Sequence, residues 1–529
     1  MMKRRDFLRG VGSAVSLAGL GRFLPACGSS DRSLPVNEAG IQHILPTVSA
    51  DRLLLKVSFA DSQPIPPVLR ADWRRVQGLA TDTDRRFWAF DVPDLEPARR
   101  YTLQIRTADF RSDPWSIRTL PARDARPEHL RLLMYTCAGG NDIFRLYVPT
   151  PVRRRLLRRA LALEPDAVVA NGDQVYWDLR AGVSALVTGK SRRGIAVAGV
   201  FDRAAPVLGH ENENVLKRAV GAQIAGLYGT MFRSIPVFFL RDDHDYFEDD
   251  QVTPELTTFP ADDFMVRLAR ATQWLYYPEF LPDPDRPLDL PAATAPDRPP
   301  GVSEAFGTLR YGQLLEALLY DCKGFLTLAG ERGTLIPSAV ERWVLQRLGD
   351  PGPDHVMQVP SNPPGWTAGK FAEWYPDVLG PDRTLTTDIP KPGWQPGWLA
   401  QHDRLLAAAA AAPDRVPLIV SGDIHSIAEG LIVRSGMHDF RVHPVVALIT
   451  GTPGTGAGWP SAARGTLATP PAHIELEPVV PVQEYNGFDL LDFEPARVTV
   501  RTYRWRKGVD SEEAIDTLEP LHVSVYRRA

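Results

Sequence analysis

The stretch FFLRDDHDYFEDD, from Phe238 to Asp250, places three aspartates, a histidine and a tyrosine directly behind a run of apolar residues. A short, continuous apolar run is typical of a strand that is covered on both faces of its sheet. Carboxylates that gather in a cleft repel one another and become protonated unless a cation lies among them. The stretch therefore predicts a buried strand that leads into a cation-binding loop.

The same arrangement recurs along the chain. The apolar runs in LRLLMYTC, DAVVANGD, PLIVSGDIH and VVALITGTPG also end in polar or glycine-rich residues. A single aspartate at a strand end is more often a helix cap or turn former than a ligand, but several such segments reverse that expectation. In layered α/β folds the loops at the carboxyl ends of strands gather around one site. The candidate residues in these loops are Cys137, Asp173, Tyr176, Asp242, Asp243, His244, Asp245, Asp423 and His425.

The types of donor atom indicate which ions the loops would bind. Thiolate, phenolate, carboxylate and imidazole together suit Fe(III) or a similar Lewis-acidic transition metal, whereas carboxylate oxygens alone suit calcium, magnesium or manganese. We therefore expect a binuclear or multinuclear centre that holds Fe(III) together with Ca(II) or another divalent ion. One aspartate would bridge two of the ions.

Length and periodicity indicate two folded units. A chain of 529 residues is too long for one ordinary hydrophobic core. In residues 34–123 apolar and polar positions alternate, as in YTLQIR, which predicts an N-terminal β-sandwich of the fibronectin or immunoglobulin type. In residues 124–529 apolar strands alternate with helical stretches, which predicts an α/β catalytic domain.

The charge of the chain argues against a nucleic acid as partner. The formal net charge is −4 and there is no large basic excess, so nucleic acid binding is not expected beyond a nucleotide as a substrate. The segment PVRRRLLRRALALEP has an apolar helical stripe with five arginines around it. We expect these arginines to lie on a solvated helix face.

The first residues predict export from the cytoplasm. Arg4 and Arg5, followed by Phe7-Leu8 and a mildly apolar run, form a twin-arginine signal that the twin-arginine export machinery would recognise. The apolar run is too short to span a bilayer. LPAC, which ends at Cys27, is typical of a lipobox, so residues 1–33 would be a signal and tether. The predicted product is a membrane-anchored lipoprotein, periplasmic or extracellular; the alternative is a simple cleavable signal.

The remaining cysteines, Cys137 and Cys322, leave two interpretations open. A chain with so few cysteines is not stabilised by a disulfide framework. Cys137 is either a metal ligand, which the residues around it favour, or one half of a disulfide with Cys322, since both cysteines follow apolar strands.

The motifs, taken together and in order, resemble the alkaline phosphatase D (PhoD-like) family of metallophosphoesterases. These are GDxxY at Asp173, DDHD at Asp242 and SGDxH at Asp423, behind a strand that ends in cysteine and an N-terminal sandwich. The resemblance covers about Leu130 to Arg506, and extends more distantly to purple acid phosphatases. It implies a layered catalytic domain, in which helices sandwich β-sheets, and the hydrolysis of phosphate monoesters or diesters.

The resemblance also implies a role for each site residue. Asp173 would bridge two metals, and His244 would be the catalytic histidine beside the phosphate. The remaining implied ligands are Cys137, Tyr176 and His425 for the ferric ion, and Asp243 and Asp423 for the second ion.

The implied mechanism is attack by a metal-activated hydroxide. Two cations roughly 3.5 to 4 Å apart neutralise the phosphate charge and lower the pKa of bound water. His244, oriented by Asp245 or a neighbouring carboxylate, would stabilise or protonate the leaving oxygen. A surface-anchored, catalytically inactive ligand-binding protein is the alternative function.

The sequence departs from the family pattern at three places. TCAGG stands where the family has SCQ, and Lys323 in YDCKGF stands where it has arginine. For the missing third-motif histidine, Gln358 in HVMQVPSN is the nearest candidate. GTPGTGAGWP, from Gly451 to Pro460, is expected to form a rim loop near the substrate rather than a dinucleotide-binding loop.

Overall fold

The computed structural model describes residues 35–177, 190–246, 261–292, 297–327, 329–367, 396–457, 459–461, 467–471 and 473–528. The expected twin-arginine signal and the lipobox cysteine at position 27 lie outside these residues. Across the part of the chain that is described, no helix combines the length and the apolar character needed to cross a membrane.

The N-terminal part of the structure is a sandwich of two four-stranded antiparallel sheets, ordered β1-β2-β6-β5 and β4-β3-β7-β8. Its strands are β1 (Ile41–Val48), β2 (Leu53–Phe59), β3 (Val68–Ala71), β4 (Arg74–Gln77), β5 (Leu79–Ala80), β6 (Phe87–Val92), β7 (Arg100–Arg106) and β8 (Trp115–Arg118). Strand β7 alternates buried and more exposed residues, as its sequence predicts. Strand β2 is buried throughout, because its polar face packs against the rest of the chain.

Buried polar contacts attach the sandwich to the larger body. The ammonium group of Lys56 in β2 lies 3.0 Å from the carboxylate of Glu279 and donates to the carbonyl of Trp274 at 3.0 Å. His43 in β1 places Nε2 2.8 Å from the carbonyl of Tyr276. The carbonyl only accepts, so Nε2 carries the proton and the neutral Nδ1 accepts from the Ser58 hydroxyl.

We predict that this interface weakens in acid. Burial lowers the pKa of His43 from 6.5 to about 4, and nearby Lys56 adds to the effect. Between these values the unfolded chain binds more protons than the folded one, so stability falls as the pH drops from 6.5 toward 4, by up to about 3 kcal/mol for this group. Melting temperatures measured across this range should fall less steeply in His43→Gln than in the wild type. Equal slopes would contradict the prediction.

The larger body contains two further sheets. The six-stranded sheet has the order β11-β10-β9-β20-β21-β22, and the other the order β12-β13-β14-β15-β18-β16-β17, with β19 also paired to β16. The strands of the first are β9 (Leu130–Tyr135), β10 (Ala167–Asn171), β11 (Val237–Leu240), β20 (Asn486–Glu494), β21 (Arg497–Trp505) and β22 (Pro520–Arg527). Those of the second are β12 (Phe306–Tyr311), β13 (Leu315–Tyr320), β14 (His355–Pro360), β15 (Leu418–Ser421), β16 (Ile427–Ser435), β17 (His438–Asp439), β18 (Val445–Ile449) and β19 (Ile474–Gln483).

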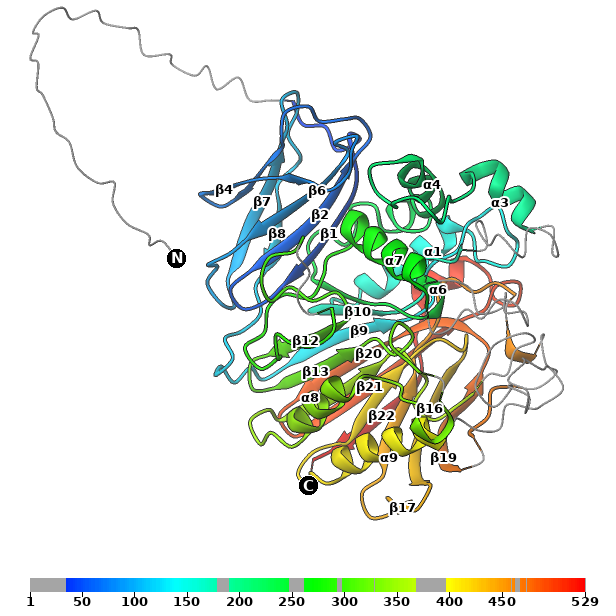
Figure 1. Cartoon of the computed structure of the whole chain (residues 1–529). Helices are drawn as coiled ribbons and strands as arrows, with labels where there is room; N and C mark the ends of the chain where they lie inside the picture. Colours follow the sequence, from blue (N-terminus) through cyan, green and yellow to red (C-terminus); the bar gives the residue numbers. More distant parts are fainter. Residues whose placement is uncertain are drawn as a thin grey trace, which may run out of the picture.

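The helices lie around these two sheets (Figure 1). They are α1 (Thr150–Leu161), α3 (Lys190–Ala198), α4 (Glu211–Val220), α5 (Ala225–Tyr228), α6 (Asp243–Tyr246), α7 (Asp263–Tyr276), α8 (Ser338–Leu348) and α9 (Pro396–Ala410), with short 3₁₀ helices at Gly330–Arg332 and Glu513–Thr517. One buried cluster joins α1, α4, α5 and α7 to β9, β10 and β11, and another joins α8 and α9 to β13 and β14.

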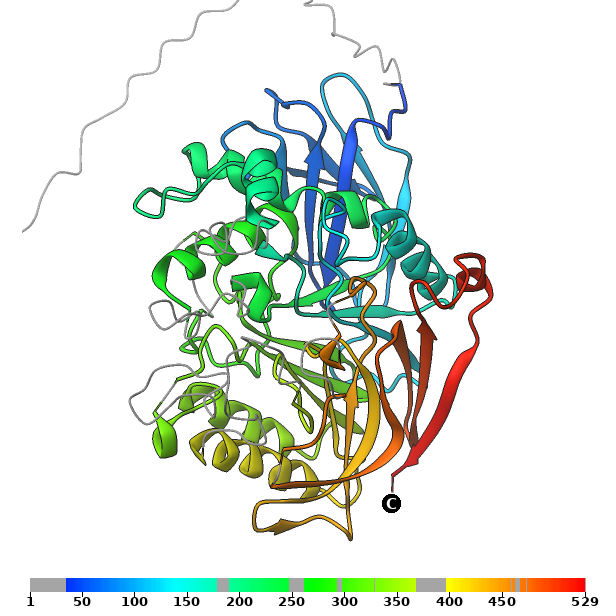
Figure 2. The same ribbon diagram turned by 90° about the vertical axis from the view of Figure 1, so that its right-hand side faces the viewer.

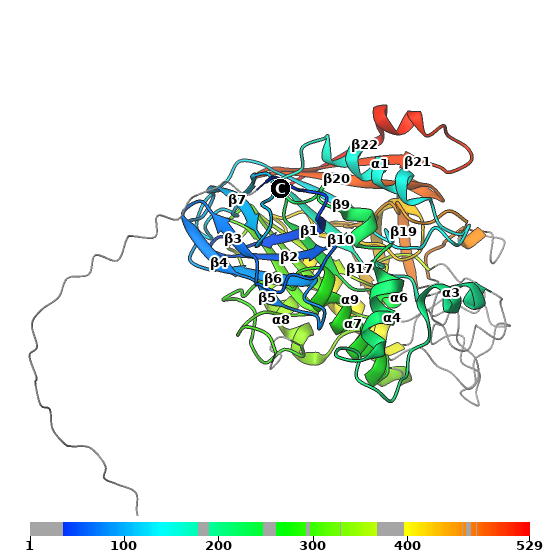
Figure 3. The same ribbon diagram turned by 90° about the horizontal axis from the view of Figure 1, so that it is seen from above.

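The core of the body lies between the two sheets. There Met134 and Val169 of one sheet share a cluster with Met357 and Val420 of the other. In Figure 2 the yellow-green helices α8 and α9 lie on one side and the orange to red strands β20 to β22 on the other. The order helix, sheet, sheet, helix confirms the predicted layered α/β architecture. Seen from above, the blue sandwich lies at the side away from α3 (Figure 3).

Candidate metal centre

The predicted site residues follow strands that run in the same direction within each sheet. Strands β9, β10 and β11 are mutually parallel, as are β13, β14, β15 and β18. Their carboxyl ends therefore meet at one edge of the body. The loops at this edge carry Cys137 after β9, Asp173 after β10, Asp242 to Asp245 after β11, Lys323 after β13, and Asp423 and His425 after β15.

Two glycines allow these loops to approach closely. A Cβ atom on Gly172, whose φ is +80°, would lie 2.4 Å from the Cβ of Asp242. A Cβ atom on Gly422 would lie 2.1 Å from the hydroxyl oxygen of Thr136. The glycine before each aspartate in NGD and SGD is therefore required by packing between loops that lie far apart in the sequence.

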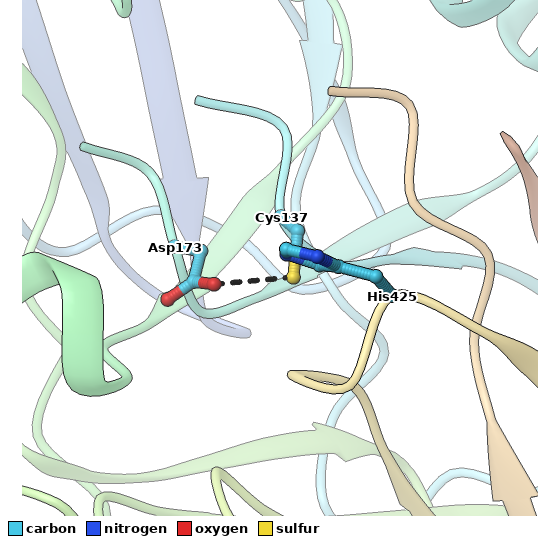
Figure 4. A group of neighbouring side chains, drawn as sticks. All are labelled: Cys137, Asp173 and His425. Carbon is cyan, nitrogen blue, oxygen red and sulfur yellow. Dashed lines mark hydrogen bonds between the residues drawn. The ribbon is translucent and has the colours of Figure 1, made fainter. Parts of the chain in front are cut away.

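A first group of donor atoms contains Cys137, Asp173 and His425, whose ligand atoms lie within 4.8 Å of one another (Figure 4). The Cys137 thiol donates to Oδ2 of Asp173 at 3.2 Å. The Tyr176 hydroxyl donates to the same oxygen at 3.0 Å and lies 2.9 Å from Nε2 of His425. Sulfur, phenol, carboxylate and imidazole donors thus converge, as the sequence predicts for a ferric site.

A second set of donors adjoins the first. Asp173, Asp243 and His244 form one group within 4.8 Å, and Asp242, Asp243 and Asp423 form another. Asp173 and Asp243 each belong to two groups, so the groups are continuous. Neither carboxylate oxygen of Asp242 accepts a hydrogen bond from any described residue. Asp242 is among the candidate residues of this loop, but the family resemblance gives it no ligand role; the structure places it in a group of ligand atoms.

The backbone at the site is strained. Cys137, Asp173, Asp423 and His425 all have positive φ, at 50°, 55°, 72° and 51°. This conformation costs a non-glycine residue about 1–3 kcal/mol and persists where the surrounding structure imposes it. Four such residues lie at the converging strand ends, so the positions of their side chains are maintained at a cost in backbone conformational energy.

The electrostatics of the site fit a cation. Burial, followed by the charges of Asp243 and other nearby carboxylates, raises the pKa of Asp173 well above its usual range. Burial likewise raises the pKa of Asp242 and of the Cys137 thiol. Such groups ionise readily only when a positive charge lies among them. The carboxylate oxygens of Asp242 and the mixed donors of the first group therefore fit a metal centre.

The two predicted catalytic residues have different surroundings. The His244 ring lies 4.2 Å from the Tyr176 ring, between centroids, and its Nε2 is 4.0 Å from Oδ2 of Asp243. The Asp245 carboxylate accepts backbone N–H groups from Gln174, Val175 and Asp242 at 2.8, 3.0 and 3.0 Å. Asp245 therefore ties the loops after β10 and β11 together, and Asp243 is the carboxylate beside the imidazole. Burial raises the pKa of Asp245 to about 7.

Sequence analysis missed the residues that support the Cys137 loop. Arg153 in α1, expected on a solvated face, is completely buried and donates to the carbonyls of residues 138, 139 and 140 at 2.8–2.9 Å. Gln223 accepts from the backbone N–H groups of Gly140 and Tyr176, both at 2.8 Å. The apolar stripe of α1 gives no signal for a buried arginine, because its partners are carbonyls of another segment.

Two further expectations are corrected. Cys137 and Cys322 are both free thiols, so the alternative disulfide is wrong. Gln358 lies within β14, where it accepts from the Tyr320 hydroxyl at 3.0 Å and donates to the carbonyl of Leu405 in α9, away from the strand end. The expected rim loop follows β18 at the same edge of the body: residues 451–455 are buried, and the Gly454 N–H and Thr452 hydroxyl donate to the carbonyl of Cys137. Its contact with a substrate remains a prediction.

We predict that the two buried thiols differ in their effect on metal binding. Cys137→Ser replaces a soft donor of the first group, so iron affinity should fall by roughly 10- to 100-fold or more, the range reached even by changes outside the direct ligands. Cys322→Ser is the matched control, because Cys322 is equally buried but lies in the cluster under α8 and α9. Elemental analysis after dialysis compares them, and equal iron content would contradict the assignment of Cys137.

Comparisons with known proteins place the fold. No protein-family profile and no curated protein match the sequence. The chain is similar to the solved structure of PhoD, with a TM-score of 0.57 and 13% identity over 94% of this chain and 91% of that chain. It is also similar to the purple acid phosphatase PPD1 from yellow lupin (Lupinus luteus) seeds, with a TM-score of 0.51 and 10% identity over 87% of this chain and 71% of that chain.

The chain therefore shares the fold of these two structures. In particular, the resemblance to the PhoD-like family that the motifs indicate is confirmed at the level of the fold.

Proposed function

We propose that this protein is a metal-dependent phosphoric ester hydrolase. The observation that carries the proposal is the position of Asp173, whose carboxylate belongs both to the Cys137–His425 group and to the Asp243–His244 group. One carboxylate shared by two adjoining sets of donors suits a pair of ions with a common ligand. The likeness of the fold to PhoD and to a purple acid phosphatase supports the same reaction class.

The donor chemistry supports two different ions. The first group offers the sulfur of Cys137, the imidazole of His425, the Tyr176 phenol and Asp173, which suit Fe(III). The group of Asp242, Asp243 and Asp423 offers only oxygen, which suits Ca(II) or another hard divalent ion. When bound, such ions neutralise phosphate charge and lower the pKa of water.

The residues of the chain itself would position the substrate and move a proton. His244 is buried, packs on the Tyr176 ring and has an Nδ1 atom that makes no hydrogen bond with any described residue. Its imidazole would protonate or stabilise the leaving oxygen. Asp245 acts through the backbone, because its carboxylate holds the loops that carry Asp173 and Asp242 in register.

Hydrolysis of simple aryl phosphates tests the proposal. Chelator-treated protein, reconstituted with Fe(III) and Ca(II), should release nitrophenol from a nitrophenyl phosphate monoester or diester. The chelator-treated protein without added metal should not. No turnover of either ester after reconstitution would favour the alternative of an inactive binding protein. The ratio of the two rates gives the preference for monoester or diester.

We further propose that the enzyme acts outside the cytoplasm, as a lipoprotein anchored at Cys27. The Arg4-Arg5 pair and the LPAC sequence support this. The double variant Arg4→Lys, Arg5→Lys should leave the protein in the cytoplasm, and Cys27→Ala should release it from the membrane fraction. A membrane association unchanged by Cys27→Ala would contradict the anchor.

A further inference from the structure

The ammonium group of Lys323 lies beside the cluster formed by the carboxylates of Asp242, Asp243 and Asp423. The ammonium group of Lys323 lies 3.1 Å from Oδ2 of Asp423 and 4.0 Å from Oδ1 of Asp242. Its side chain is 5% exposed, and those of Asp242 and Asp423 are 1% and 3% exposed. The lysine therefore contacts the proposed all-oxygen site directly, out of solvent.

The loop that carries Lys323 is held firmly. The Asp321 carboxylate accepts from the Gly324 N–H at 2.9 Å and from the Tyr246 hydroxyl, and lies 3.6 Å from Nε of Arg241. The Cys322 N–H donates to the Ser361 hydroxyl at 2.8 Å. The backbone at Lys323 is thus fixed on both sides, so the position of its ammonium group is a built feature of the site.

A second acidic cluster shows a lysine that contacts every carboxylate of such a group. Asp82, Asp84 and Glu213 also place their ligand atoms within 4.8 Å of one another. The ammonium group of Lys217 contacts all three carboxylates, at 2.6, 3.0 and 2.6 Å. We call this cluster closed, because each of its carboxylates contacts the ammonium group.

Lys323 lies at unequal distances from two carboxylates of its cluster. Its ammonium group lies 3.1 Å from Asp423 and 4.0 Å from Asp242, whose two oxygens accept no hydrogen bond from the described residues. Three ionised carboxylates and one ammonium group leave two negative charges, which a divalent ion would balance. An ion that enters this cluster meets a like charge at close range, and like charges in a buried site repel strongly.

We propose that Lys323 competes with the second metal ion for the Asp242–Asp243–Asp423 cluster, so that this site binds its divalent ion weakly and fills only when that ion is abundant. The inference rests on the proposed function, since it concerns the second ion of that centre. Lys323 acts through its positive charge, which sets the affinity of this site for the divalent ion.

Calcium binding to protein already loaded with iron tests the proposal. Chelator-treated protein is given one equivalent of Fe(III), and Ca²⁺ binding is then measured by equilibrium dialysis. Lys323→Met removes the charge and keeps a similar length, so it should bind Ca²⁺ about 5- to 150-fold more tightly than the wild type, the usual range for coupling between two sites. Lys323→Arg keeps the charge and should bind Ca²⁺ as weakly as the wild type.

Lys323→Gln provides a second neutral variant should the methionine variant not fold. Ca²⁺ affinities of the neutral variants equal to or below that of the wild type would overturn the proposal, while iron retention would leave the proposed function intact. Loss of iron from every protein, including the wild type, would contradict the proposed function itself, and this inference with it.

Discussion

Replacing Asp173 with asparagine is expected to abolish most hydrolytic activity and to lower the content of both metals. The carboxylate belongs to two donor groups, so one substitution weakens both. Loss of several kcal/mol of transition-state stabilisation from the metal centre corresponds to a fall in turnover of roughly 10²- to 10⁴-fold. Turnover of a nitrophenyl phosphate and elemental analysis of the same sample would measure the two effects.

The loss of activity and metal in Asp173→Asn must be distinguished from a loss of protein stability. Asp82→Asn is a suitable control, because Asp82 is a buried aspartate whose ion pair with Lys217 lies in the closed cluster. It should lower the melting temperature while leaving metal content and the activity of the folded enzyme near wild type. Two tightly bound metals and full activity in Asp173→Asn would contradict the assignment of Asp173 as the shared ligand.

Replacing His244 with asparagine is expected to lower turnover by about 10²- to 10⁴-fold, the range for loss of a general acid. Unlike Asp173→Asn, His244→Asn should keep a metal content near that of the wild type. His425→Asn is the matched comparison, because His425 belongs to the first donor group and its loss should reduce iron content.

The structure makes the result for His244 informative in either direction. Its imidazole also belongs to the donor group of Asp173 and Asp243, whose ligand atoms lie within 4.8 Å of one another. If His244→Asn loses metal to the same extent as His425→Asn, His244 is a ligand and its assignment as the acid is wrong. Full turnover with full metal content would remove it from the reaction altogether.

The residues that carry the chemistry could be found from sequence because their signal is local. Asp173 and Asp423 each follow a glycine at the end of an apolar strand, and the structure explains that glycine by the close approach of another loop. The continuous apolar runs also predict strands covered on both faces, which is how the two sheets of the body are arranged. The layered fold was therefore predictable.

What the sequence could not supply depends on contacts between distant segments. Asp242 and Asp243 share one donor group with Asp423, although they follow β11 and Asp423 follows β15 of the other sheet. Arg153 is charged and adjoins an apolar stripe, so nothing local indicates that it binds three carbonyls of the Cys137 loop. The position of Lys323 beside Asp423 joins residues 100 apart in sequence.

The most direct test of the central claim is anomalous X-ray diffraction from crystals of the protein reconstituted with Fe(III) and Ca(II). We expect an iron peak within about 2.0–2.3 Å of the Cys137 sulfur, the Asp173 carboxylate and the His425 imidazole, as for other transition-metal ligands. Iron bound elsewhere, for example at the Asp82–Asp84–Glu213 cluster, or no bound iron, would contradict the proposed metal centre.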